Sequence, residues 1–363
     1  MVKRVYNFYA GPATLPFSVI EKASKNVLEF NNLGISILEI SHRAIEFDKV
    51  IKEAQKDIKE IMNLDDNYHV LFLQGGASLQ FHMIPLNLML ESKPALYVNT
   101  GAWSKKAIKE SKIIDENNTK VVASSEDKNF TYIPKEIPCD SSASYLHITT
   151  NNTIYGTEYH FFPDTGDVPL VADMSSDILN RNLDFKKFAL IYAGAQKNLG
   201  PAGTTLVIIR DDLVKRTENK KLPTLLNYKT HVEKDSLFNT PSVFAVYVVH
   251  LVLKWIKDEM GGLKNVEKLN RKKAELLYST IDDMSDFYRG TAEKDSRSLM
   301  NVTFRLPSEE LEKRFVEKAA ERDLIGLKGH RSVGGIRASI YNAFPYEGVE
   351  KLVEFMRDFR KNS

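Results

Sequence analysis

A single lysine, Lys197, separates two apolar runs in the stretch LIYAGAQKNLGPAGTTLVII, residues 190–209. A tight hairpin would favour a short Asn-Gly or Gly-Gly turn, whereas this connection is long and contains Gly200, Pro201 and Gly203. Glycines allow a ligand to approach the backbone closely. The segment therefore indicates a role beyond chain reversal, with the lysine amine as the candidate reactive group.

Three other apolar runs end in residues that could assist this amine. The run VLFLQGGAS ends in a Gly-Gly turn before a predicted helix, where backbone N–H groups and the Ser78 hydroxyl could bind an anion. ALYVNTGAW ends in Trp103, a large flat ring, and VPLVADMSS contains Asp173 directly after its apolar run. Ligands bind at the carboxyl ends of the strands in an open α/β sheet, so we expect these groups along one edge.

Each of these residues also has an ordinary structural explanation. A Gly-Gly pair is commonly a turn, a tryptophan packs, an aspartate caps a helix, and a loop lysine is a solvated charge. Together, however, a phosphate cradle, a stacking ring, a carboxylate and an amine match the requirements of pyridoxal 5'-phosphate. In that interpretation the lysine forms a Schiff base with the cofactor aldehyde, and the carboxylate keeps the pyridine nitrogen protonated.

The elements that would position these residues follow an α/β pattern. Seven short runs are too continuously apolar for a half-exposed sheet, which predicts a buried, mostly parallel central sheet. They are YHVLFLQ, ALYVNT, KVVAS, SYLHITT, VPLVADM, FALIYAG and TTLVIIR. Helical periodicity over residues 45–62 and 76–90 predicts helices that flank the sheet.

A change of pattern predicts a second domain. A long apolar helix ends at Gly261 and Gly262, which suit a helix C-terminus. Beyond it we expect a charged helix, the strand LMNVTFRL, a helix near residues 314–322, the strand GIRASIYN and a final helix. The predicted division is an N-terminal segment (1–15), a large cofactor-binding α/β domain (16–262) and a small C-terminal α+β domain (263–363).

Composition favours an ordinary globular protein in a reducing cytoplasm. The 50 basic and 48 acidic residues are mixed along the 363-residue chain and give a net charge of +2, so nothing suggests a nucleic-acid partner. The single cysteine, Cys139, cannot form an internal disulfide, and the N-terminus lacks the apolar run of a signal peptide. The longest apolar stretch, residues 242–256, is too short for a membrane span.

At this point the sequence resembles the pyridoxal-phosphate-dependent aminotransferases of class V, which have the fold type I architecture. The resemblance covers essentially the whole chain. The motifs that carry it are NFYAGPATLP, EISHR, QGGAS, ADMSSDIL, IYAGAQKNLGPAG, FNTPS and LKGHRSVGGIRASIYNA. The two His-Arg motifs and the GIRASIYNA segment resemble the branch of this family that acts on phosphoserine.

The resemblance implies a role for each cofactor-binding residue. Lys197 would be the Schiff-base lysine, and Asp173 would pair with the pyridine nitrogen. Trp103 would stack on the ring, and Thr153 would bond the cofactor's 3'-oxygen. The remaining contacts, all to the phosphate, would come from Ala77, Ser78 and Gln196, and from Asn239 and Thr240 of a second subunit. No metal is expected.

A substrate with a carboxylate and a phosphate needs two separated cationic sites, and arginine suits both because its fork makes bidentate bonds. By resemblance, Arg337 would bind the α-carboxylate. The phosphate, or the side-chain carboxylate of glutamate, would lie among His42, Arg43, His330 and Arg331. Without the resemblance, surface charge or a structural ion pair would be the simpler explanation of these residues.

The implied activity is reversible, ping-pong transfer of an amino group between O-phospho-L-serine and 2-oxoglutarate, giving 3-phosphohydroxypyruvate and L-glutamate in L-serine biosynthesis. Lys197 would move the α-proton. A homodimer with shared active sites is expected, in which the FNTPS and GHR segments could reach the partner's cofactor. A further role in pyridoxine biosynthesis stays open.

Three rival interpretations remain open at this stage. A cysteine desulfurase would need a mobile nucleophilic cysteine, but Cys139 lies far upstream of the segment expected to supply it. A serine-pyruvate type aminotransferase would not need two His-Arg pairs. A nucleotide-binding module would be expected to contain G-x-G-x-x-G after the first strand or a P-loop motif, and the sequence contains neither.

Overall fold

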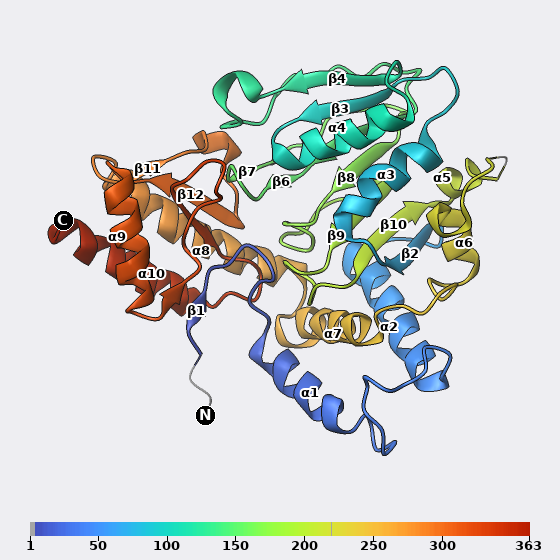
Figure 1. Cartoon of the computed structure of the whole chain (residues 1–363), viewed down its shortest axis with the longest axis horizontal. Coiled ribbons are helices and arrows are strands. Elements are labelled where there is room, and N and C mark those ends of the chain that lie inside the picture. The colour runs from blue at the N-terminus through green and yellow to red at the C-terminus, as the bar shows by residue number, and fades with distance from the viewer. Residues whose placement is uncertain (1–3, 219) are drawn as a thin grey trace.

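A seven-stranded sheet lies at the centre of the large part of the chain (Figure 1), whose computed structural model describes residues 4–218 and 220–363. In spatial order its strands are β2 (Tyr68–Leu73), β10 (Thr205–Arg210), β9 (Leu190–Gly194), β8 (Leu170–Asp173), β5 (Tyr145–Thr149), β3 (Ala95–Asn99) and β4 (Thr119–Ser124). These are the seven predicted strands. Only β10 runs antiparallel to its neighbours β2 and β9, so the predicted mostly parallel sheet is confirmed.

The segment around Lys197 differs in one respect from the interpretation of its sequence. Strands β9 and β10 pair antiparallel, with Leu190 opposite Ile209 and Gly194 opposite Thr205. The segment is therefore a β-hairpin after all, closed by a wide loop rather than a two-residue turn. The width of the loop leaves Lys197 at the sheet edge.

Helices cover both faces of this sheet, because successive strand side chains alternate between two buried layers. Ile191 and Ala193 pack in the layer that includes α1 (Phe17–Leu28), α2 (Ile45–Met62) and α7 (Val243–Lys254). Leu190 and Tyr192 pack in the opposite layer, with α3 (Gly76–Leu88) and α4 (Ala102–Ile114). The helix predicted over 45–62 is confirmed at both ends, and the one predicted over 76–90 ends at Leu88.

Shorter elements complete the large part. They are β6 (Asn151–Asn152), β7 (Thr157–Glu158), η1 (Glu126–Lys128), η2 (Phe185–Lys187), α5 (Asp211–Lys215), η3 (Thr224–Leu226), α6 (Tyr228–Glu233) and the π-helical turn η4 (Trp255–Glu259). The turn η4 extends α7 up to the predicted Gly261-Gly262 end. Among the helices of the described ranges, none is both long and apolar enough to cross a membrane.

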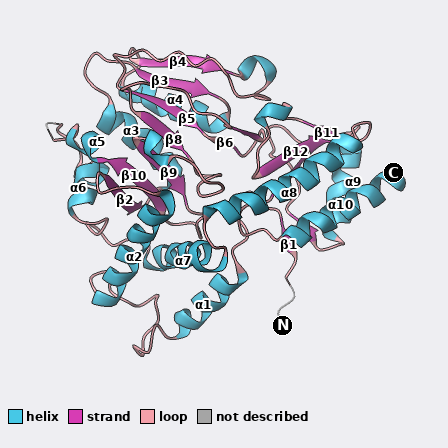
Figure 2. Ribbon diagram, turned by 180° about the vertical axis from the view of Figure 1, so that it is seen from behind, coloured by secondary structure: helices cyan, strands magenta, loops and turns pink. Residues whose placement is uncertain are grey.

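The C-terminal part contains the predicted helices and strands and adds two two-residue strands, β11 and β13. Its elements are α8 (Leu263–Asp283), β11 (Arg289–Gly290), η5 (Lys294–Ser296), β12 (Asn301–Arg305), α9 (Glu309–Ala320), β13 (Leu324–Ile325), β14 (Ile336–Ser339) and α10 (Tyr346–Lys361). Strands β11, β12 and β14 form an antiparallel sheet (Figure 2). The N-terminal strand β1 (Tyr6–Asn7) pairs with β13, and Phe8 packs in the C-terminal core. The division into domains at residues 15 and 262 stays a prediction.

Candidate active site

A cavity of about 370 Å³ lies at the carboxyl edge of the central sheet. Seven of the nine residues predicted to bind the cofactor line it: Ala77, Ser78, Trp103, Thr153, Asp173, Gln196 and Lys197. Two of the five predicted substrate residues, His330 and Arg337, line it as well. Residues far apart in the sequence therefore meet where the ends of the parallel strands converge.

Lys197 follows β9 and extends into this cavity. Its Nζ donates a hydrogen bond to Thr153 Oγ1 at 2.7 Å and lies 5.6 Å from the centre of the Trp103 ring. Burial lowers the pKa of Lys197 from 10.5 to about 8, against the opposing effect of the nearby Asp173 carboxylate, and Arg337 lowers it further. The amine is therefore neutral far more often near pH 8 than a surface lysine, which makes it a competent nucleophile and base.

Asp173 is the last residue of β8 and is buried. Its Oδ1 accepts a hydrogen bond from the Ser175 backbone N–H at 2.9 Å. Burial raises the pKa of Asp173, although the bonds from Ser175 and the charge of Lys197 oppose the rise. A buried carboxylate of this kind gains from a cationic partner in the cavity.

The phosphate cradle predicted at the start of α3 has the geometry of a helix N-terminus open to solvent. Gly75 and Gly76 have φ values of +89° and +67°, and a Cβ on Gly75 would lie 2.5 Å from the Leu79 side chain. Only glycine fits such a turn without strain. The first N–H groups of the helix, at Gly76, Ala77 and Ser78, have no partner within the helix, so they could bind an anion.

Trp103 lies at the start of α4, which places its ring against two cations. Lys106 Nζ lies 4.4 Å from the ring centre, in addition to Lys197. The indole Nε1 is buried and has no hydrogen-bond partner among the described residues. Buried donors without partners are uncommon, so this atom is available to a ligand or a water molecule.

Arg337 enters the cavity from β14 of the C-terminal sheet. Its Nε is buried and, within residues 4–218 and 220–363, without a hydrogen-bond partner, and burial lowers the pKa of its guanidinium. His330 lies beside it, and burial together with the charges of Arg337 and Arg331 lowers the pKa of its imidazole. Arg331 itself lines a neighbouring cavity of about 770 Å³. The C-terminal part thus supplies positive charge next to Lys197.

Besides Arg331, four predicted residues do not line the cavity of their own chain. Arg43 is exposed and His42 half-buried, in the loop before α2. Asn239 donates to Gln74 Oε1 at 2.8 Å, and Gln74 Nε2 donates to the Thr240 carbonyl at 2.6 Å. The four residues reach a cofactor only if a second subunit brings them there. His330 differs, because it lines the same cavity as Lys197 without a partner.

Sequence reasoning missed the contribution of the N-terminal segment. Ala10 and Gly11 line the cavity, and a Cβ on Gly11 would lie 3.4 Å from Lys197 Cγ. The Tyr341 hydroxyl donates to the Ala10 carbonyl at 2.8 Å, and the Ala13 N–H donates to the Gln196 carbonyl at 2.9 Å. The motif NFYAGPATLP was the available signal, but its spacing alone assigns no contact.

Asn151, Ser175 and Ser176 were missed in the same way. All three line the cavity. Asn151 Nδ2 donates to Ser176 Oγ at 2.8 Å, and Ser175 Oγ accepts from the Gly194 N–H at 3.1 Å. These bonds connect the strand ends to one another, and they depend on neighbours that are distant in sequence.

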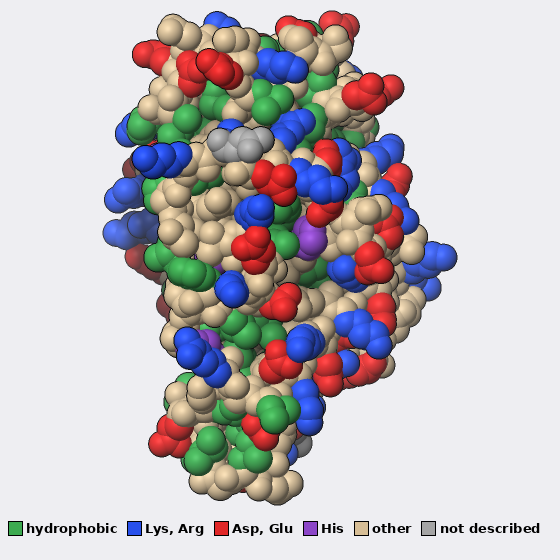
Figure 3. All heavy atoms as spheres, turned by 90° about the vertical axis from the view of Figure 1, so that its right-hand side faces the viewer, with side chains coloured by type: hydrophobic (Ala, Val, Ile, Leu, Met, Phe, Trp, Pro, Cys, Tyr) green, Lys and Arg blue, Asp and Glu red, His purple; other side chains and the backbone are tan. Residues whose placement is uncertain are grey.

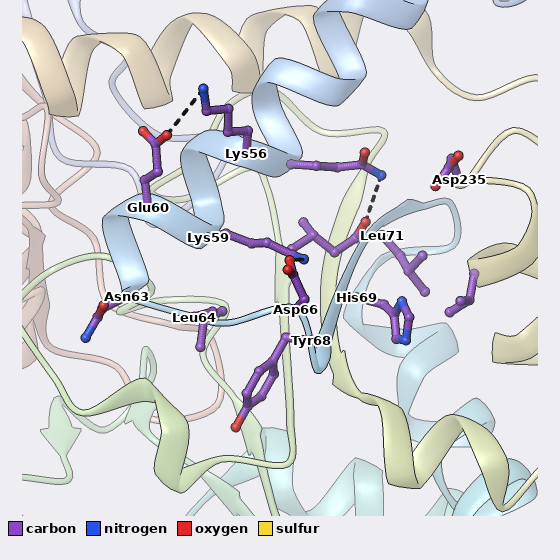
Figure 4. A pocket seen from close by; sticks show the side chains of 13 residues that line it. Lys56, Lys59, Glu60, Asn63, Leu64, Asp66, Tyr68, His69, Leu71 and Asp235 are labelled. Carbon is purple, nitrogen blue, oxygen red and sulfur yellow. Dashed lines mark hydrogen bonds and ion pairs between the residues drawn. The ribbon is translucent and has the colours of Figure 1, made fainter.

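A larger hollow of about 710 Å³ lies elsewhere, beside α2 and β2 (Figure 4). Four of its charged side chains pair with each other, Lys56 with Glu60 at 3.6 Å and Lys59 with Asp66 at 3.2 Å. Gln55 Nε2 donates to the Val70 carbonyl at 3.0 Å. None of the predicted site residues lines this hollow, so its size does not indicate an active site.

Comparison with known proteins gives a consistent match. The family described as aminotransferase class-V matches residues 5–352. The phosphoserine aminotransferase of Desulfosudis oleivorans is 56% identical over 363 residues, which is the whole of both chains. The solved structure of phosphoserine aminotransferase from Bacillus circulans subsp. alkalophilus is 53% identical, covers 99% of both chains and superposes with a TM-score of 0.96. A pyridoxal-phosphate-bound phosphoserine aminotransferase from Trichomonas vaginalis is 37% identical, with a TM-score of 0.92, over 98% of this chain and 100% of the other.

Proposed function

The chain belongs to the aminotransferase class-V family, and on that premise we propose that it transfers an amino group between O-phospho-L-serine and 2-oxoglutarate. The products are 3-phosphohydroxypyruvate and L-glutamate, and the two half-reactions alternate at one site. The observation that carries the proposal is the position of Arg337, whose buried Nε lacks a partner in the described part of the chain and which lines the same cavity as Lys197. A buried guanidinium with an unused donor favours an anionic ligand.

The residues of the cavity fit pyridoxal 5'-phosphate. The α3 N-terminus offers N–H donors at Ala77 and Ser78 to the phosphate. Trp103, whose Nε1 has no hydrogen-bond partner among the described residues, offers its ring to an aromatic ligand. Asp173 offers a carboxylate for the pyridine nitrogen, and Lys197 offers an amine. When bound, the cofactor supplies an aldehyde that accepts the amino group and a ring that withdraws electrons from the substrate Cα.

Lys197 moves the proton in this mechanism. Its Nζ, with a pKa near 8, accepts the α-proton and later returns a proton. Thr153 Oγ1, 2.7 Å away, accepts a hydrogen bond from Nζ and holds the amine toward the cavity. Asp173 would hold the pyridine nitrogen and would keep its negative charge if that nitrogen is protonated, because an opposite charge favours the ionised form.

The two anionic groups of the substrate bind at opposite ends of the site. Arg337 binds the α-carboxylate through two parallel N–H donors. His330 and Arg331 lie toward the far end, where the phosphate of phosphoserine or the side-chain carboxylate of glutamate binds, and the partner subunit contributes His42 and Arg43. Asn239 and Thr240 of the partner subunit would hold the cofactor phosphate. We place the resulting homodimer in the cytoplasm, in L-serine biosynthesis.

A half-reaction titration tests the proposal. Purified holoenzyme is mixed separately with phosphoserine, glutamate, alanine and serine, and the visible absorbance of the cofactor is followed. Phosphoserine and glutamate are expected to change the spectrum at concentrations at least about a hundredfold lower than alanine or serine do, because two anion sites add their binding energies. Equal responses to alanine and phosphoserine would instead indicate a serine-pyruvate type enzyme.

A further inference from the structure

The segment that carries His330 and Arg331 is a closed loop on the edge of the C-terminal sheet. The Gly329 N–H donates to the Gly335 carbonyl at 2.8 Å, which joins the two ends of the loop. Within it, the N–H groups of Val333 and Gly334 donate to the His330 carbonyl at 3.0 and 2.9 Å. The outer side of this loop borders the 770 Å³ cavity rather than packed core. Its position therefore depends on a few specific contacts.

Glu312 supplies one of these contacts. It lies in the first turn of α9, where it is only 7% exposed, and its carboxylate accepts three hydrogen bonds. Oε1 accepts from Arg305 Nε at 2.5 Å and from the Leu306 N–H at 3.3 Å. Oε2 accepts from the Gly335 N–H at 3.1 Å. A single buried carboxylate thus connects the end of β12 to the C-terminal end of the loop.

Arg305 supplies the second contact. While its Nε binds Glu312, its Nη1 donates to the Val333 carbonyl at 2.9 Å. The backbone of the loop also packs against this side chain, because a Cβ on Gly335 would lie 2.7 Å from Arg305 Cδ. The planar guanidinium can make both bonds at once, which a lysine ammonium at the end of a flexible chain does poorly.

We infer that the Glu312–Arg305 pair positions the loop of residues 329–335, which carries His330 and Arg331. The pair thereby helps to set the preference for substrates that have a second anionic group at the end away from the α-carboxylate, the far-end anion. The inference rests on the proposed function, since His330 and Arg331 matter for selectivity only if that anion binds near them. Neither Glu312 nor Arg305 lines the cavity that contains Lys197, so the pair acts through the loop. Arg337 lies only two residues beyond Gly335, but it is also held by the β12–β14 pairing through Thr303. The α-carboxylate site should therefore be affected less than the far-end site.

Two substitutions test the pair. In Glu312→Gln the amide oxygen of the new side chain can still accept a hydrogen bond from Arg305. Its amide NH₂ group then faces the Gly335 N–H, and because both groups are donors the contact with the loop is lost. Arg305→Lys keeps a charge for Glu312 and loses the simultaneous bond to Val333. The matched control is Glu321→Gln at the end of α9, which removes an exposed pair with Lys318 at 2.9 Å.

The first measurement concerns the loop itself and needs no substrate. Amide hydrogen exchange in residues 328–335 of the holoenzyme should be faster in Glu312→Gln and Arg305→Lys than in the wild type or the control. Unchanged exchange in both variants would overturn the assignment of the pair as a positioning device, whatever the substrate proves to be.

The second measurement is the second-order rate constant of the half-reaction with phosphoserine and with alanine, determined under single-turnover conditions. Both variants are expected to lose about tenfold or more with phosphoserine and less than about twofold with alanine, because displacement of a binding group by about 1 Å weakens only the anion that it contacts. Equal losses with both substrates, or none, would overturn the selectivity role. A wild-type enzyme without a preference for phosphoserine would instead refute the proposed function, and the exchange result would still stand by itself.

Discussion

At the scale of single residues, Lys197 is held between two opposing electrostatic influences. Burial disfavours its charged form, whereas the Asp173 carboxylate favours it, and burial is the larger effect. The result is an amine whose pKa, at about 8, is close to the range in which proton transfer in both directions is efficient. The same burial has a cost for the stability of the cofactor-free protein.

Replacing Lys197 by Met should abolish transamination and stabilise the cofactor-free protein near pH 7 by roughly 1–3 kcal/mol. Between the folded pKa of about 8 and the unfolded value of 10.5, the unfolded chain binds the extra proton, so wild-type stability rises with pH. The difference between variant and wild type should therefore shrink as the pH rises from 8 to 10.5. Urea unfolding of both cofactor-free proteins at several pH values measures this difference in the free energy of unfolding. A difference that does not change with pH would contradict the lowered pKa of Lys197.

Arg337→Lys should reduce kcat/KM for phosphoserine and glutamate alike, by about tenfold to a hundredfold, because each presents an α-carboxylate and lysine cannot form the bidentate pair. Steady-state kinetics with both substrates measures the effect. Arg322→Lys is the control, since it changes an exposed arginine that pairs with Asp358 at 2.9 Å. Loss with only one of the two substrates would remove Arg337 from the α-carboxylate site.

At the scale of elements, the β6–β7 turn carries Thr153 and packs against strand β12. Asn151 Nδ2 donates to Asn301 Oδ1 at 2.8 Å, and Thr303 Oγ1 donates to the Tyr155 carbonyl at 3.1 Å. This contact brings the C-terminal sheet, with Arg337 on its neighbouring strand, to the cofactor side of the large part. The close approach depends on Gly156.

Gly156→Ala should destabilise the protein by roughly 2–4 kcal/mol. The φ of +73° at this position is strained for alanine. In addition, the new Cβ would lie 2.9 Å from the Asn301 carbonyl oxygen and closer still to the Thr303 hydroxyl. Gly166→Ala is the matched control. Gly166 also has a positive φ, +54°, but apart from its two chain neighbours no described residue lies within 4 Å of its Cβ position, so about 1 kcal/mol is expected. Urea unfolding of the two variants compares the costs, and equal costs would show that the contact with β12 is not tight.

At the scale of the whole molecule, an apolar surface surrounds the loop that carries His42 and Arg43. Leu28, Leu38 and Ile45 are 84%, 60% and 70% exposed. Hydrophobic side chains gather at the lower end of the face in Figure 3, where α1 and the following loop lie in Figure 1. Exposed apolar groups in such a cluster favour an interface, and a second copy of the chain would bring the two basic residues to its partner's cavity.

Mixed dimers test this arrangement. Lys197→Ala and Arg43→Ala subunits, each weakly active or inactive alone, are combined by subunit exchange. If Arg43 serves the partner's site, half of the dimers are mixed and each has one intact site, so activity returns to about a quarter of wild type. The same experiment with Arg331→Ala in place of Arg43→Ala should restore none, because the His330 loop borders the cavity of its own chain. Confirmed exchange without recovery for Arg43 would place that residue in its own subunit's site.

The sequence alone was sufficient to predict the strands and helices that are completely buried. Six of the seven strands are buried along nearly their whole length because helices cover both sides of the sheet, so each appears as a continuous apolar run. The edge strand β4 is the exception, since only Thr119 of its six residues is buried. The helix over residues 45–62 was found at both ends because its periodicity is strong and Asn63 ends it in a left-handed conformation. Strand ends also indicated where Lys197, Asp173 and Trp103 would meet, since parallel strands share a carboxyl edge.

Only the tertiary structure decided the rest. The two-residue strands β1, β11 and β13 have no pattern of their own and exist because a partner strand pairs with them. The antiparallel direction of β10 depends on how a wide loop folds back, which an apolar run does not encode. Ala10 enters the site through a bond from Tyr341, 331 residues away, and Glu312 reaches Gly335 across 23 residues. Local composition reports burial, whereas contacts between distant segments depend on the packing of the whole chain.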